Sequence, residues 1–442
     1  MKKKCIIFLL LFLGLNQAHA QENKIDFTAY KLPNGLHVIL HQDNTTPIVA
    51  VTILYHVGSK NEVPGRTGFA HFFEHLMFEG SENIKRGTFD KIVQTAGGTS
   101  NANTSQDRTF YYEIFPSNQL ELGLWLESER LLHLRIDSTG VETQRAVVKE
   151  EKKQRIDNRP YGSILEKTMN HAYKVHPYRW TPIGYPEDIN KASLKEFIDF
   201  HSMYYVPNNA TLSIAGDIDI ETTKKLIEKY FGNIPTGQKD ILRPAEIEPE
   251  KTAEVRDTVY DNIQLPAVIM SYHMPAQGTT DYYALSMLTT LLSDGESSRL
   301  SKSIVDKQQK AMQLQAIPLA MEDPGLFIIF GLVNTGVTLP DLESSIETEI
   351  NKVKTEDVSE LEFRKLQNKV ENDFVTGNST MAGIAENLAQ YQVYYGDADL
   401  INTEIGRYMK VTRDDLKRVA GKYLNKENRV VLYYLPKPTA KN

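Results

Sequence analysis

The chain repeats one order of strands and helices on either side of a segment rich in proline and charge, and this recurrence limits its fold most. Residues 47–56 and 266–273 are both rich in β-branched side chains, and both lead through a polar loop into a helical pattern. Residues 204–212 and 422–430, which close the two halves, also resemble each other. The recurrence indicates a duplicated domain, with repeated surface turns as the alternative explanation.

Size and composition also favour two domains. The chain has 442 residues, of which 41% are hydrophobic and 24% charged, whereas a typical domain has about 100–150 residues. Residues 235–256 contain prolines and charges with little periodicity, as domain linkers do. We therefore expect an α+β fold of two duplicated α/β sandwich domains, residues 21–234 and residues 257–442, joined by that linker.

The N-terminal residues predict export. Three lysines at positions 2 to 4 precede an apolar run over residues 5–15, and the small residues Ala18 and Ala20 follow at the spacing of a signal-peptidase site. The run is shorter than the ~20 residues of a membrane-spanning helix. We expect a signal peptide at residues 1–20, no stable membrane insertion, and a periplasmic location if the source is a Gram-negative bacterium.

Charge and cysteine content exclude several functions. The net charge is −7, so the chain lacks the basic surface of a nucleic-acid-binding protein. Its one cysteine, Cys5, lies within the expected signal peptide, which leaves the exported chain without disulfides or cysteine ligands. Any metal must therefore be bound by histidine, aspartate or glutamate.

The segment His71-Phe72-Phe73-Glu74-His75 is the clearest candidate for a site. On a helix, His71 and His75 lie one turn apart and project together, with Glu74 close to the same face. Two imidazoles in this arrangement can bind Zn²⁺, and the carboxylate beside them can act as a general base toward water. A helix with solvated His and Glu is the alternative, but neighbouring phenylalanines make this helix apolar nearly all round and predict that it is buried.

A catalytic zinc ion usually has three protein ligands, so a third ligand is expected elsewhere in the chain. The helical pattern over residues 143–156 offers Glu150 and Glu151. Glu151 shares a face with Gln144 and Val148 by helical spacing, whereas Glu150 points roughly 100° away. Periodicity therefore favours Glu151, and a solvated glutamate is the alternative.

Several stretches together resemble the pitrilysin-type (M16, inverzincin) zinc metallopeptidases, in their two-domain form of about 50 kDa. The matching residues are 65–78, 98–104, 145–151, 176–178 and 295–300. The resemblance implies one Zn²⁺ per chain on His71, His75 and Glu151, with Glu74 as general base. It also implies hydrolysis of peptide bonds in peptides or unfolded segments, and a clamshell-type dimer.

The same resemblance implies where the peptide binds and where this chain departs from the family. Asn101 and Ala102 correspond to an edge strand that receives the substrate as an added β-strand, although the residues alone favour an ordinary polar loop. Gln144 stands where the family usually has a glutamate near the metal, which should alter the electrostatics around the site without removing a ligand.

A second departure concerns partners. Val305 and Met312 stand where the family pattern has an arginine and a tyrosine that contact substrate, and neither side chain can donate a hydrogen bond to a carbonyl oxygen. We therefore expect a heterodimer with a zinc-free homologue that supplies the pair, with a homodimer as the alternative. A non-catalytic structural or assembly subunit of the same fold is the competing function, and it predicts a decayed metal motif, which this chain does not have.

Overall fold

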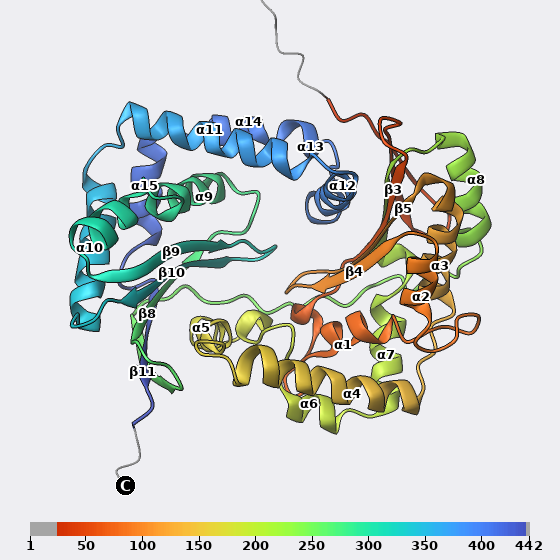
Figure 1. Cartoon of the computed structure of the whole chain (residues 1–442), viewed down its shortest axis with the longest axis horizontal. Helices are drawn as coiled ribbons and strands as arrows, with labels where there is room; N and C mark the ends of the chain where they lie inside the picture. The colour runs from red at the N-terminus through yellow and green to blue at the C-terminus, as the bar shows by residue number, and fades with distance from the viewer. Residues whose placement is uncertain (1–23, 439–442) are drawn as a thin grey trace, which may run out of the picture.

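The computed structural model describes residues 24–438 and contains two β-sheets, each with its own group of helices (Figure 1). The expected signal peptide at residues 1–20 lies outside the described residues. None of the helices within the described part of the chain is long and apolar enough to cross a membrane.

The first sheet has six strands in the order β1-β2-β6-β3-β5-β4. All neighbouring strands in it are antiparallel except β2 and β6, which run parallel. The strands are β1 (Thr28–Lys31), β2 (His37–Gln42), β3 (Ile48–Tyr55), β4 (Thr99–Thr104), β5 (Thr109–Pro116) and β6 (Ala210–Gly216).

One face of this sheet packs against helices of the same half. Alternate residues such as Val38, Val51 and Ile53 join the helical side chains Leu124 and Phe231 in one buried cluster, as the period of two in a strand requires. The helices of this half are α1 (Phe69–Leu76), α2 (Phe89–Thr95), α3 (Leu120–Leu132), α4 (Ser138–Lys152), α5 (Ile164–Ala172), α6 (Pro186–Lys191), α7 (Leu194–Tyr204) and α8 (Ile220–Phe231).

The second sheet has five strands in the order β7-β11-β8-β10-β9 and contains the same single parallel pair, β7 with β11. Its strands are β7 (Val255–Asp261), β8 (Ala267–Met274), β9 (Ala311–Leu319), β10 (Gly325–Val333) and β11 (Arg429–Pro436). Its helices are α9 (Thr280–Ser293), α10 (Leu339–Thr355), α11 (Glu360–Gly377), α12 (Met381–Tyr395), α13 (Leu400–Thr403), α14 (Ile405–Met409) and α15 (Arg413–Tyr423).

The two halves are duplicates, as the sequence predicted. Strands β2, β6, β3, β5 and β4 correspond in order and direction to β7, β11, β8, β10 and β9. The likeness extends to single hydrogen bonds: the Asn209 amide donates to the carbonyls of His56 and Tyr204, and the Asn428 amide donates to those of His273 and Tyr423.

Each sheet receives a helix from the other half (Figure 1). Helix α12 lies across β3 and β6 of the first sheet, where Leu388 and its neighbours pack on Ile39 and Ala50. Helix α5 packs in return against β8 and β11, with Met169 and Ile269 in one buried cluster. Each half therefore completes the core of the other.

The segment that joins the halves is fixed at two points. The Arg243 guanidinium donates to the Asn209 Oδ1 at 2.6 Å and also to the carbonyl of His56. The carboxylate of Glu248 accepts three successive backbone N–H groups, those of residues 174–176, at 2.8 to 2.9 Å. Strand β7 begins at Val255, and the domain boundaries at 234 and 257 stay a prediction.

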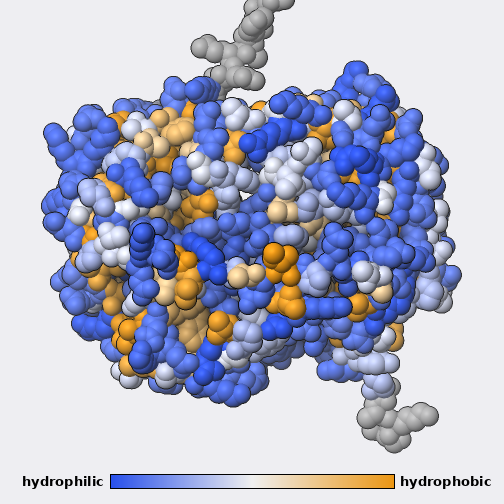
Figure 2. Space-filling view, turned by 180° about the vertical axis from the view of Figure 1, so that it is seen from behind, coloured by the Kyte–Doolittle hydropathy of each residue, from blue (hydrophilic) through white to orange (hydrophobic). Residues whose placement is uncertain are grey.

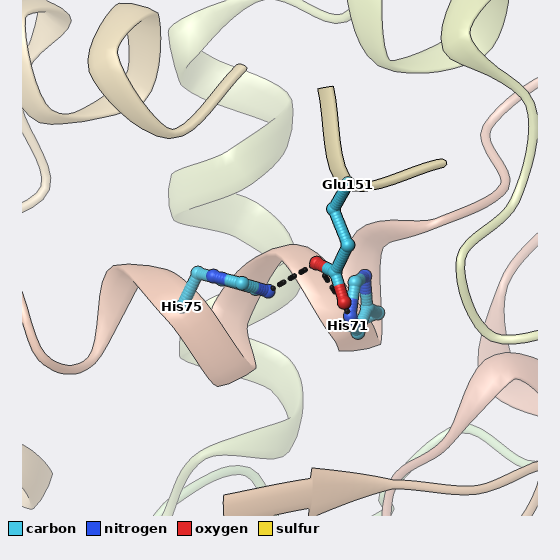
Figure 3. Close-up of side chains that lie close together, drawn as sticks. All are labelled: His71, His75 and Glu151. Carbon is cyan, nitrogen blue, oxygen red and sulfur yellow. Dashed lines mark ion pairs between the residues drawn. The ribbon is translucent and has the colours of Figure 1, made fainter. Parts of the chain in front are cut away.

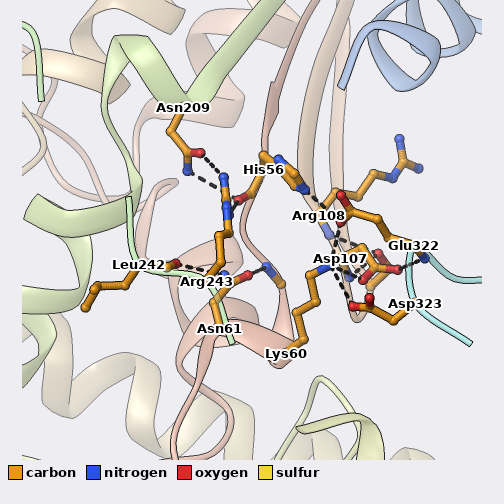
Figure 4. Close-up of polar contacts among 12 residues, drawn as sticks. His56, Lys60, Asn61, Asp107, Arg108, Asn209, Leu242, Arg243, Glu322 and Asp323 are labelled. Atoms are coloured by element: carbon orange, nitrogen blue, oxygen red, sulfur yellow. Dashed lines mark hydrogen bonds and ion pairs between the residues drawn. The ribbon is translucent and has the colours of Figure 1, made fainter. Parts of the chain in front are cut away.

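A buried lysine ties the two halves together (Figure 4). The Lys60 Nζ lies 3.0 Å from Asp107 Oδ1, 2.5 Å from Glu322 Oε2 and 3.5 Å from Asp323 Oδ2, and its side chain is 5% exposed. His56 Nε2 contacts the same Glu322 at 2.8 Å. These contacts join the turn between β9 and β10 to the turn between β4 and β5.

The outer surface is mostly polar. Figure 2 shows the face opposite to that of Figure 1, where hydrophilic residues predominate and apolar residues gather in small groups. Exposed apolar side chains within the described residues include Leu242 and Ile247 of the joining segment. The metal-site motif is not part of such a surface, because most of α1 is buried.

Because α12 belongs to the second half but packs on the first sheet, a cavity made in α12 should destabilise the whole protein. Leu388 is completely buried against the first sheet, so Leu388→Ala should lower the free energy of unfolding by about 2–5 kcal/mol. Urea denaturation followed by circular dichroism measures this. The same change at Leu361, which is 80% exposed, should cost less than about 0.5 kcal/mol. Equal effects at both positions would contradict the packing.

Candidate metal centre

Helix α1 carries the motif and is held firmly at its start. It follows Gly68, whose φ of 91° suits glycine, and where a Cβ atom would lie 2.9 Å from the Ile183 carbonyl oxygen. The carboxylate of Glu62 accepts hydrogen bonds from the backbone N–H groups of Gly68 and Ala70, at 2.8 and 2.9 Å. Burial raises the pKa of Glu62 well above its usual range, although these hydrogen bonds oppose the shift.

The apolar face of α1 fixes its rotation. The Phe72 ring stacks on Phe197 of α7 with centroids 4.5 Å apart, and Phe73 lies in the same core. Two tyrosine hydroxyls donate to backbone carbonyls of the helix, Tyr111 to Phe73 at 3.0 Å and Tyr205 to Ala70 at 3.4 Å. The two histidines of α1 therefore face Glu151 of α4.

The structure brings His71, His75 and Glu151 together (Figure 3). Glu151 Oε2 lies 2.9 Å from His75 Nε2 and 3.6 Å from His71 Nε2, and one ligand atom from each residue lies within 4.8 Å of the others. Glu150, the other glutamate in the pair, points outward with its side chain 54% exposed. The residue selected by helical periodicity is thus the one beside the histidines.

The protonation states suit metal binding. Burial, together with the neighbouring His75, lowers the pKa of His71 to about 4, so this imidazole is neutral near pH 7. A hydrogen bond from His75 and the attraction of both histidines lower the pKa of Glu151, which keeps it ionised. Burial raises the pKa of Glu74, the direction that improves a carboxylate as a proton acceptor near neutral pH.

These three residues fit a divalent transition metal. Two imidazoles and one carboxylate form the three-ligand type of set found in catalytic zinc sites. Among residues 24–438 no other group of three histidine, cysteine, aspartate or glutamate side chains comes close enough to hold a metal ion. The Nδ1 of His71 is buried without a hydrogen-bond partner, and its Nε2 is the ring atom that faces Glu151.

Strand β4 lies beside α1 and forms the open edge of the first sheet. It pairs only with β5, with Asn101 opposite Tyr112 and Ala102 opposite Tyr111. The Asn101 side chain is exposed, and its Oδ1 accepts a hydrogen bond from the Ala102 N–H. The polar loop favoured by the residues alone is wrong, because residues 99–104 form a regular strand.

The remaining sequence candidates have other surroundings. The Gln144 amide donates to the carboxylate of Glu79 in the loop after α1, and Glu79 also pairs with Arg86. Val305 packs against the second core, and Met312 is 57% exposed on β9.

Two residues near the site were missed by sequence reasoning. Arg155 contacts Glu151 of the cluster, and its spacing of four residues from Glu151 was a visible signal. Glu62, which holds the start of α1, has no such signal, because its partners are backbone N–H groups brought near by the fold.

Comparisons with known proteins match this fold. Residues 37–183 match the family model described as Insulinase (Peptidase family M16), and residues 191–370 match the one described as Peptidase M16 inactive domain. The zinc protease PqqE of Helicobacter pylori is 33% identical, over 97% of this chain and 97% of that protein.

Solved structures show the same architecture. The crystal structure of a protease from Helicobacter pylori superposes with a TM-score of 0.89 at 32% identity, covering 93% of this chain and 100% of that chain. The periplasmic protease PqqL from Escherichia coli gives a TM-score of 0.76 at 17% identity, and the match covers 92% of this chain but 47% of that chain.

Two sheets of one topology and a His-His-Glu cluster define the chain as a zinc-protease-type protein. It belongs to the M16 peptidase family.

The geometry predicts that Glu151 and not Glu150 supports metal affinity. Glu151→Gln should weaken Zn²⁺ binding by at least about 100-fold, because it replaces an anionic ligand. Glu150→Gln removes the same charge one residue away, from an exposed side chain, and should leave the affinity within about threefold. Competition with a chromogenic chelator measures both. Equal losses would show that net charge alone matters.

Burial of His201 predicts a pH-dependent stability. Its Nε2 is buried without a partner, its ring stacks on Tyr205, and burial lowers its pKa to about 4. The unfolded chain therefore binds this proton more readily below about pH 6.5, so the contribution to stability is present at high pH and is lost as the pH falls toward 4. In metal-free protein, His201→Gln should reduce the loss of unfolding free energy between pH 8 and pH 5 by about 2 kcal/mol. An unchanged pH profile in denaturant titrations would contradict the assignment.

Proposed function

We propose that this chain is an exported zinc-dependent endopeptidase or oligopeptidase that hydrolyses peptide bonds in peptides or unfolded segments. The single observation that supports this most is the cluster of His71, His75 and Glu151, with Glu74 on the same short helix. The similarity to proteins named zinc proteases supports the same metal.

The residues of the chain have distinct tasks in this reaction. His71, His75 and Glu151 would hold the zinc ion, which when bound polarises the scissile carbonyl and acidifies water. The Glu74 carboxylate accepts a proton from the attacking water and delivers it to the nitrogen of the leaving amine. Burial of Glu74, which raises its pKa, favours the first of these transfers, in which the carboxylate acts as the base.

The peptide is proposed to bind along β4. An extended segment can add to the open edge of the sheet at Asn101 and Ala102 through backbone hydrogen bonds, with little regard to its own side chains. To do so it must take the Ala102 N–H from Asn101 Oδ1. Folded proteins cannot offer such a segment, so peptides and flexible regions are the expected substrates.

We propose that a second M16 chain completes the site in a clamshell dimer. Val305 is packed in the second core and Met312 offers no donor, so this chain does not supply the arginine and tyrosine that the family resemblance implies. The Escherichia coli relative, of which this chain spans about half, supports an assembly of two such units. A zinc-free homologue is the favoured partner, and a second copy of this chain is the alternative.

Export is proposed from residues 1–20, with the periplasm as destination in a Gram-negative source. The structural likeness to a periplasmic protease agrees with this location.

A non-catalytic assembly subunit is the second candidate. It is favoured by the match of residues 191–370 to a family model described as an inactive domain. The intact ligand set in the first half weighs against it.

Peptide hydrolysis by the purified, zinc-loaded protein separates these functions. A quenched peptide library should be cleaved, a chelator should abolish cleavage, and Glu74→Gln should lower turnover by about 10²–10⁴-fold with zinc still bound. Glu150→Gln is the matched control and should keep full turnover, because that carboxylate is exposed and pairs with Lys153.

If the zinc-loaded chain alone cleaves no peptide, addition of a homologue that carries the arginine and tyrosine should restore cleavage. Light scattering of the mixture gives the stoichiometry of the complex. No cleavage with that partner present would favour the assembly subunit. Full turnover by Glu74→Gln would exclude Glu74 as the base.

A further inference from the structure

One cation lies directly against the metal-site cluster. Arg155 Nη1 is 2.7 Å from Glu151 Oε1, whereas Glu151 Oε2 faces the two histidines. The two partners differ sharply in exposure, because the Arg155 side chain is 75% exposed and that of Glu151 only 13%. A surface ion pair within a helix normally exposes both partners, so this is not an ordinary pair of that kind.

The chain builds an irregular turn to place Arg155 there. Helix α4 ends at Lys152 and continues as a π-helical turn over Lys153–Asp157, a distortion that is frequent at functional sites. Lys152 is buried and pairs with Glu166, which fixes the beginning of the turn.

The far end of the turn is fixed by the second half of the molecule. Tyr161 has a φ of 62°, unusual for a residue with a side chain. Its hydroxyl donates to the Leu265 carbonyl at 2.6 Å, its N–H donates to Asp261 Oδ2 at 3.0 Å, and its ring packs against Phe330. The backbone of Arg155 is therefore held on both sides, while its guanidinium faces solvent.

The free donors of Arg155 suit a second carboxylate. A guanidinium has five N–H donors in a planar fork, and Glu151 occupies only one of its edges. A peptide bound beside these residues would pass within reach of this cation.

We propose that Arg155 is a specificity-determining residue that recognises a carboxylate of the peptide close to the cleaved bond. The carboxylate is that of an acidic side chain or of the peptide C-terminus. This inference rests on the proposed peptidase function for the place where the peptide binds.

Peptide affinity tests the proposal without turnover. Labelled peptides are titrated by fluorescence anisotropy onto zinc-loaded Glu74→Gln protein, in pairs that differ only by Asp against Asn at one position. A second pair has a free or an amidated C-terminus and so separates the two sources of the carboxylate. At least one charged peptide should bind about fivefold more tightly than its neutral partner at low ionic strength, and salt should reduce the difference.

Variants assign the preference to Arg155. Introduced into the Glu74→Gln protein, Arg155→Gln should reduce the ratio of affinities for charged and neutral peptides to about one. Arg155→Lys should keep part of this ratio, because the charge stays while the planar fork of N–H donors is lost. Lys153→Gln removes an equal charge in the same turn, from a side chain that is 61% exposed and pairs with Glu150, and should keep the full ratio.

Three results would overturn the proposal: a preference that survives Arg155→Gln, an equal loss of affinity for charged and neutral peptides, or no binding of any peptide. The second result would mean that Arg155 only positions Glu151 if Arg155→Gln also weakens Zn²⁺ binding. Chelator competition measures that binding. The library assay on the unaltered protein tests peptidase activity separately, so a chain that binds acidic peptides and cleaves none would refute only the proposed function.

Discussion

Mutual coverage of the two sheets is the constraint on which the rest of the structure depends. A sheet with one face on its own helices still has a second apolar face to bury, and here α12 and α5 each cross to the opposite half to do so. Neither half is a closed unit. Apolar burial already sets how the two halves pack together, and the Lys60 cluster and the joining segment add polar contacts between them.

The cluster of His71, His75 and Glu151 takes its geometry from the contacts that hold helix α1. Helix α1 is short, and an isolated helix of eight residues would not be stable in water. Its position comes from Glu62 at its start, two tyrosine hydroxyls along its length and the phenylalanines beneath it. These three sets of contacts fix the position of α1. The two imidazoles of α1 can therefore lie beside a glutamate from another helix.

The parts of the fold and the site that depend on local side-chain patterns could be predicted from the sequence. Strand β3 follows from its β-branched residues, and helices α1 and α7 follow from helical periodicity. The same periodicity separated Glu151 from Glu150. Strand β4 could not be recognised in this way, because Thr99–Thr104 is polar apart from Ala102 and becomes a strand only through its pairing with β5. The π-turn that places Arg155, the exchange of α5 and α12, and the partners of Lys60 depend on segments far apart in the chain, which no local pattern encodes.

The exchange of helices also dictates the order in which the molecule can become compact. Ribosomes deliver the first sheet, complete at Gly216, well before the helix that covers it, which begins at Met381. Until then Ile39, Ala50 and Ala215 lack the cover that Leu388 and its neighbours in α12 give them in the folded protein. During synthesis the first half therefore cannot complete its core until α12 has been made, and part of its apolar face remains exposed to aggregation until then.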